Sequence, residues 1–113
     1  MAPHRINHSV CASCLEEGFD RYLRLRRFSR LREATLNVYT ANFRRFLRFA
    51  FEGKTRKYGP FVNEPQSAID QGFLVTFQQA LVDEGMQVAG ALTYGVPVRG
   101  AFDWAPRCEH TDA

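Results

Sequence analysis

The spacing of apolar residues in the middle of the chain constrains the fold more than any other feature of the sequence. From about Ala34 to Phe51, apolar side chains recur every three or four positions, which places them on one face of an α-helix. These residues are Leu36, Tyr39, Phe43, Phe46, Leu47 and Ala50. A helix with one apolar face is stable only when other elements cover that face. The segment therefore predicts an amphipathic helix that shares a core with the rest of the chain.

Two further segments have the same helical period, and a third has it with interruptions. The first runs from about Cys14 to Phe28. The second begins near Ser67, which resembles a capping box together with Asp70, and stops at Gly85. The interrupted segment covers about 88–105 and contains Pro97, which should kink it or split it in two. Residues 52–66 hold two glycines and two prolines and are expected to form a loop.

The length of 113 residues suits one compact core, and 45% apolar residues are too many for a disordered chain. These features predict an all-α single domain of about four helices at 14–105, with flexible tails at 1–13 and 106–113. The apolar runs are far shorter than the roughly 18 residues of a membrane span, and the N-terminus lacks the apolar region of a secretory signal. A cytoplasmic protein without a membrane partner is therefore expected.

Positive charge is concentrated in one part of the chain. Residues 21–58 contain ten arginines and two lysines but only two acidic residues, Glu33 and Glu52. The planar guanidinium group binds phosphate oxygens with two parallel hydrogen bonds, so the excess of arginine over lysine favours a polyanionic partner. Each arginine taken alone is equally consistent with a solvated helix face, but a surface made only for solubility would mix both signs. The block as a whole therefore favours nucleic acid.

Three cysteines in a chain without an export signal predict reduced thiols rather than a disulfide framework. Cys11-x-x-Cys14 and Cys108-x-His110 together have the ligand types of a structural zinc site, so zinc binding stays an open question. The second pair has an unusually short spacer, and the prediction includes no metal or cofactor. A redox role for Cys11 and Cys14 is disfavoured because no strand is expected before the helix, as a thioredoxin-like site would have.

Two segments have a residue pattern that is more specific than helical periodicity. In residues 35–49, Thr35 is followed by Tyr39 and later by a Phe-Leu pair, a basic residue and an aromatic residue. In residues 98–105, Arg99 precedes Phe102 and a Trp-Ala pair. These segments resemble the second helix and the end of the fourth helix of the N-terminal core-binding domain of tyrosine recombinases, the SAM-like domain of phage integrases. Residues 77–85 are similar to its third helix. The resemblance covers about residues 15–105 and implies an orthogonal helical bundle that closes over one side of duplex DNA.

The resemblance and the charge pattern together predict a DNA-binding module, either a truncated integrase or a stand-alone relative. Its implied partners are double-stranded DNA and other recombinase subunits. Thr35, Asn37 and Thr40 are suited to hydrogen bonds with phosphates or base edges, and Thr35 is equally suited to cap a helix. The expected DNA-binding residues are Arg24, Arg27, Arg30, Arg32, Thr35, Asn37, Thr40, Arg44, Arg48, Lys54, Arg56 and Lys57.

No enzymatic activity is predicted. The catalytic arginines, lysine, histidine and tyrosine of the recombinase family have no counterpart in this chain, and its three histidines fall in the expected tails. An alternative from another functional class is a small helical module that binds a protein or RNA through its basic face. In that case a helix such as the fourth would dock onto the partner.

Overall fold

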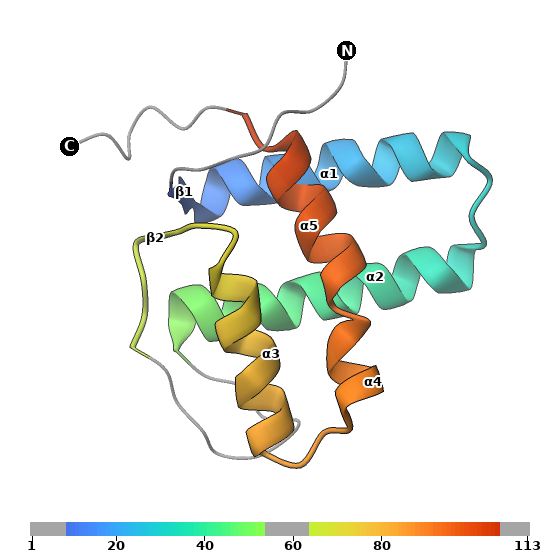
Figure 1. Ribbon diagram of the computed structural model, residues 1–113. Coiled ribbons are helices and arrows are strands. Elements are labelled where there is room, and N and C mark those ends of the chain that lie inside the picture. The colour runs from blue at the N-terminus through green and yellow to red at the C-terminus, as the bar shows by residue number, and fades with distance from the viewer. Residues whose placement is uncertain (1–8, 54–63, 107–113) are drawn as a thin grey trace.

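The computed structural model describes residues 9–53 and 64–106 (Figure 1). In chain order its elements are β1 (Val10–Cys11), α1 (Ala12–Phe28), α2 (Glu33–Leu47), η1 (Arg48–Glu52), β2 (Ala68–Ile69), α3 (Phe73–Asp83), α4 (Val88–Leu92) and α5 (Gly95–Trp104). The element η1 is a π-helical turn that continues α2 without a break. The described residues thus form an all-α fold with one pair of very short strands, which confirms the predicted fold class.

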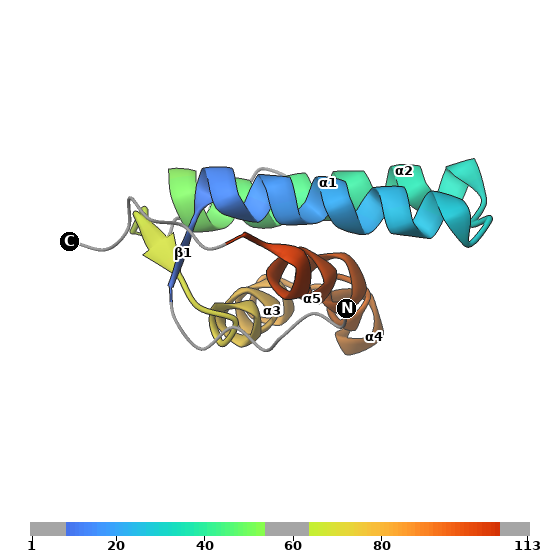
Figure 2. The same cartoon turned by 90° about the horizontal axis from the view of Figure 1, so that it is seen from above.

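The helices lie in two layers. Figure 2 shows α1 and α2 side by side in one layer and α3, α4 and α5 in the other. The two long helices run in opposite directions and are joined by a short turn (Figure 1). Helix α5 packs against both of them, whereas α3 and α4 pack against each other. One face of the α1–α2 hairpin is therefore covered by the second layer and the other face is open.

Two glycines allow α1 and α5 to cross at close range. A Cβ atom at Gly18 would lie 2.1 Å from the carbonyl oxygen of Ala101, and one at Gly100 would lie 2.5 Å from the ring of Tyr22. Real Cβ atoms do not come this close to other atoms, so neither position accepts a side chain without movement of its neighbours. Gly100 looks like a helix breaker in the sequence, but its role in the structure is close packing.

The interrupted fourth segment is split into two helices, as predicted, but not at the proline. The break between α4 and α5 falls at Thr93 and Tyr94, which form a turn. Pro97 is the third residue of α5. A proline is tolerated in the first helical turn because the N–H groups there have no acceptor within the helix.

The third helix begins later than its sequence suggests. Ser67 does not cap a helix, because Ala68 and Ile69 form strand β2 and α3 starts only at Phe73. Strand β2 pairs with β1 in antiparallel register, with Val10 opposite Ile69. Both side chains are buried, so Ile69 is held in the core by strand pairing rather than by a helix face. Residues 10–13, expected in a tail, form β1 and the first turn of α1.

Aromatic side chains from α1, α2, α3 and α5 and from η1 build the core. The rings of Phe19 on α1 and Phe43 on α2 are stacked, with centroids 4.2 Å apart. Phe46 makes an edge contact with Phe77 on α3 at 5.2 Å, and it is fully buried. The predicted apolar face of α2 is thus confirmed. Phe49 in η1 also lies in this core, 5.2 Å from Phe77, although the predicted apolar face did not include it.

None of the helices in residues 9–53 and 64–106 combines the length and the apolar character that crossing a lipid bilayer requires.

Candidate nucleic-acid interface

Most arginines of the described residues lie on the α1–α2 hairpin and on η1. Of the predicted DNA-binding residues, Arg24 and Arg27 lie on α1, Arg30 and Arg32 in the turn, and the others on α2 or η1. Lys54, Arg56 and Lys57 lie outside the described residues. All six described arginines of the predicted set are exposed to solvent. Their contacts divide them into two groups.

Three of the four arginines of α1 form ion pairs with acidic residues on the same or the next helix. The Nη2 of Arg21 lies 2.8 Å from the Oε2 of Glu17. The Nη2 of Arg24 donates a hydrogen bond to the carboxylate of Asp20, one helical turn earlier. Arg27 lies 3.7 Å from Glu33 at the start of α2. The hydrogen bond and the charge of Asp20 raise the pKa of Arg24 above its ordinary value. Exposed pairs of this kind add little stability, but they offset the positive charge of α1.

A count of charges along the sequence does not reveal that these arginines of α1 are neutralised. Glu17 and Asp20 lie just before residue 21, where the basic block begins, so a count along the chain leaves them out. On a helix, however, residues four positions apart are neighbours, and both acids reach forward to an arginine. The i,i+4 spacing of the acidic and basic residues was the signal that could have revealed it.

The turn between α1 and α2 holds an arginine in an unusual backbone conformation. Arg30 has a φ of 63°, in the left-handed region that glycine normally occupies. Its N–H donates to the carbonyl of Arg27, and the N–H of Leu31 donates to that of Arg26. This is the Schellman arrangement that ends many helices, with glycine favoured at the position of Arg30. Backbone strain of this kind is typical of functional positions, so we expect the side chain of Arg30 to have a function.

The exposed face of α2 carries a row of polar and basic residues. Asn37, Ala41, Arg44 and Arg48 follow each other at helical spacing and are all exposed. Ala34 and Val38 are exposed beside this row. Within the described residues, Arg44 and Arg48 form no ion pair, and the same holds for Arg30 and Arg32 in the turn. In the described part of the hairpin and η1, these four arginines are the ones that are exposed and lack an acidic partner.

The threonines of the predicted set are less available. The hydroxyl of Thr40 donates to the carbonyl of Leu36 at 2.9 Å, so its proton is already used. Thr35 is half-buried and is the third residue of α2. The N-cap of α2 is Arg32, without a side-chain cap, so the suggested capping role of Thr35 is wrong.

Arg26 and Arg45 have structural contacts instead. The Nε of Arg26 donates to the hydroxyl of Tyr22 at 3.1 Å, and Arg45 donates to the hydroxyl of Tyr94. Each guanidinium also lies over the ring of its tyrosine. Both side chains are half-buried, and neither belongs to the predicted set.

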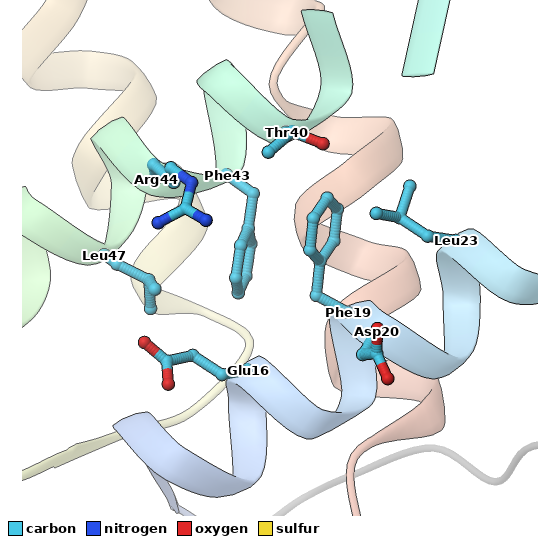
Figure 3. A pocket seen from close by; sticks show the side chains of 8 residues that line it. All are labelled: Glu16, Phe19, Asp20, Leu23, Thr40, Phe43, Arg44 and Leu47. Carbon is cyan, nitrogen blue, oxygen red and sulfur yellow. The ribbon is translucent and has the colours of Figure 1, made fainter. Parts of the chain in front are cut away.

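A groove of about 330 Å³ separates the two long helices on the open face of the hairpin. Figure 3 shows the stacked rings of Phe19 and Phe43 between its two sides, with the guanidinium of Arg44 on α2 and the carboxylates of Glu16 and Asp20 on α1. The α1 side of the groove is therefore acidic and the α2 side is basic. A polyanion would be attracted to α2 and the turn, and repelled from the N-terminal half of α1.

The cysteines differ from the expectation. Cys11 and Cys14 are both disulfide-bonded, so the predicted reduced thiols are wrong for these two residues. Strand pairing and the first turn of α1 order both residues, which were expected in or beside a flexible tail. In the described part of the chain, no three metal-binding side chains come together. Cys108 and His110 lie outside that part.

Comparisons of the chain with protein-family models, with curated proteins and with solved structures gave no match.

Proposed function

We propose that this protein binds duplex DNA through the exposed face of α2 and the turn before it. The observation that carries the proposal is the set of four exposed arginines without acidic partners, Arg30, Arg32, Arg44 and Arg48, on one edge of the described hairpin. Arginines of this kind release counterions when they contact phosphates, which supplies affinity without sequence information. The proposal also includes a cytoplasmic location. It further includes that the protein is a module similar to the core-binding domain of tyrosine recombinases.

The length of α2 suits a duplex. With a rise of about 1.5 Å per residue, Arg32 and Arg48 lie about 24 Å apart along the helix, whereas the major groove is about 12 Å wide. The two ends can therefore contact phosphates on both sides of a groove. Between them Ala34, Asn37, Val38 and Ala41 are exposed and none is larger than valine or asparagine, so the helix can come close to the base edges. The acidic Glu33, at the start of α2, is also exposed and is paired with Arg27. Asn37 is the residue that could read a base, because its amide pairs with adenine.

The strained backbone of Arg30 also supports the proposal. A residue other than glycine in the left-handed region lowers stability by about 1 kcal/mol. A charged side chain that serves only solubility would not need this position, since the turn has other exposed sites. At the end of the hairpin, Arg30 and Arg32 together can contact the phosphate backbone of one DNA strand.

A salt titration of duplex binding tests the mechanism. Four phosphate contacts predict that log affinity falls with log salt concentration at a slope of about −3.5 or steeper. Arg44→Ala should make the slope shallower by about 1 and weaken binding to all sequences equally. Arg99→Ala is the matched control, because Arg99 is an exposed arginine on α5 in the other layer. A slope near zero, or equal losses for Arg44→Ala and Arg99→Ala, would contradict the proposed surface.

A second candidate function is docking onto another protein, and one observation favours it. Val88, Leu92 and Val96 follow each other at four-residue spacing along α4 and the start of α5, and they are 60%, 59% and 42% exposed. Val88 and Leu92 lie on one face of α4, and an exposed apolar face of this kind is typical of a helix that a partner covers. Leu92→Glu should abolish a protein complex and leave duplex binding unchanged.

If RNA binds more tightly than duplex DNA of the same length, the basic face serves RNA instead.

A further inference from the structure

Cys11 and Cys14 occupy a defined place at the start of α1. Cys11 is the N-cap residue of the helix, in an extended conformation, and Cys14 is the third residue of the first turn. Strand β1 ends at Cys11, where it pairs with Ala68 of β2. A redox role was disfavoured because no strand was expected before the helix. The structure has a strand of two residues there, of which Cys11 is the second, so the two cysteines are judged by their own surroundings.

The two sulfur atoms have different surroundings. Cys11 is half-exposed, whereas Cys14 is 7% exposed and belongs to the core cluster with Val10 and Leu15. The hydroxyl oxygen of Ser13 lies 3.4 Å from the Sγ of Cys11. The first N–H groups of an α-helix have no acceptor within the helix, and together they carry a partial positive charge. In the disulfide, the sulfur of Cys11 forms no capping hydrogen bond to these N–H groups. Once the disulfide is reduced, the helix N-terminus and Ser13 favour a thiolate at Cys11, which is accessible from solvent.

We propose that Cys11 and Cys14 form one dithiol–disulfide couple that exchanges with small-molecule thiols, with Cys11 as the sulfur that reacts first. Both residues are disulfide-bonded, and their spacing and positions fit a bond between them. The proposal does not rest on DNA binding, although the site lies near the Arg44 and Arg48 end of the proposed DNA surface, where both arginines line a pocket together with Ala12.

The exchange proceeds in two balanced steps. The thiolate of a small thiol attacks the Sγ of Cys11, the protein disulfide breaks, and Cys14 leaves as a thiolate that takes up a proton. A second small thiol attacks the mixed disulfide at its small-molecule sulfur, and Cys11 leaves as a thiolate. The protein disulfide is reduced by two electrons, and two thiols are oxidised to one small-molecule disulfide. The reverse sequence oxidises the protein.

Peptide mapping of the full chain tests the pairing. After oxidation with glutathione disulfide and blocking of free thiols, one tryptic peptide should contain both Cys11 and Cys14 in unblocked form. A peptide that joins either of them to Cys108 would overturn the proposal. In Cys108→Ser, titration with glutathione buffers should change the two cysteines together, from no labelled thiol to two. Independent titration of the two thiols would also overturn it.

Reactivity tests the difference between the two sulfurs. In the Cys108→Ser background, Cys14→Ser leaves Cys11 as the single thiol, and Cys11→Ser leaves Cys14. The thiol of Cys11 should react with glutathione disulfide at least roughly ten-fold faster than that of Cys14, because only Cys11 is accessible and stabilised as a thiolate. Ser13→Ala should slow the reaction of Cys11 and leave that of Cys14 unchanged. Equal or reversed rates in folded variants, checked by circular dichroism, would contradict the assignment.

Discussion

Replacing Gly18 by alanine tests the close crossing of α1 and α5. A Cβ atom at this position would lie 2.1 Å from the carbonyl oxygen of Ala101, and 2.7 Å from both the Cα and the N of Ala105. All three atoms belong to the backbone of α5 or the residue just after it, so none can rotate away as a side chain could. The clash can be relieved only by moving one helix relative to the other.

The size of the effect follows from two opposing contributions. Real Cβ atoms keep at least about 3.0 Å from their neighbours, so α1 and α5 must separate by about 1 Å. Overpacking of this kind lowers stability by about 1–3 kcal/mol, and more where the backbone itself collides. Alanine also favours the helix by about 1 kcal/mol relative to glycine. The clash outweighs this helix preference, so we expect a net loss of about 2 kcal/mol and a fall in Tm of roughly 10 °C.

Gly90→Ala is the matched control, because it makes the same substitution within another helix. A Cβ at Gly90 would lie 3.2 Å and 3.4 Å from the Cγ and Sδ of Met86. Methionine is flexible and can move away, so the helix preference of alanine should prevail. We expect Gly90→Ala to raise stability by up to about 1 kcal/mol.

Thermal and urea denaturation, followed by circular dichroism at 222 nm, measure both variants against the wild type. The two substitutions should change stability in opposite directions. If Gly18→Ala were as stable as the wild type or more so, α1 and α5 would not cross at this glycine, and the packing of the two layers would have to be revised.

Four other predictions follow from the structure. Phe46→Ala should destabilise the protein by about 3–5 kcal/mol in urea denaturation, because the ring is fully buried, and a harmless change would refute its place in the core. Arg30→Gly should raise Tm by relieving the left-handed backbone while weakening duplex binding, and unchanged binding would remove Arg30 from the interface. Asp20→Asn should free Arg24 and strengthen duplex binding by roughly two-fold or more in a fluorescence titration, whereas weaker binding would place the DNA on α1. A suicide duplex substrate should trap no covalent adduct on Tyr22 or Tyr94, because both are buried and their hydroxyls already accept arginine hydrogen bonds; a trapped adduct would contradict the prediction that the chain has no enzymatic activity.

Much of the helical fold could be predicted because the pattern of apolar residues is local. The spacing of Phe43, Phe46 and Leu47 indicates which face of α2 is buried, and the structure buries or half-buries all three. The capping box at Ser67 failed because Ile69 is held by Val10, a partner far away in the chain. A pattern that uses only neighbouring residues cannot contain such a contact. The packing role of Gly100 was missed for the same reason, since it depends on Tyr22.

The candidate interface was predictable in composition but not in geometry. The sequence locates the arginines, and six of the predicted ones are exposed. It does not separate the arginines that are neutralised by Glu17, Asp20 and Glu33 from those that are free. Nor does it show that Arg30 adopts a left-handed conformation, because the residue type favours the opposite. Both facts depend on where helices end and which side chains face each other.

The crossing of α1 and α5 affects how the chain folds as well as how stable it is. Gly18 and Ala101 lie about 80 positions apart, and closing a flexible loop of that length opposes folding by about 4 kcal/mol before any contact forms. The α1–α2 hairpin closes a much shorter loop, so it should form first and the crossing last. During synthesis α1 leaves the ribosome long before α5. The part of α1 that faces α5, with Gly18 and Tyr22, therefore stays uncovered until α5 has been made, even where Phe19 has already stacked on Phe43 of α2.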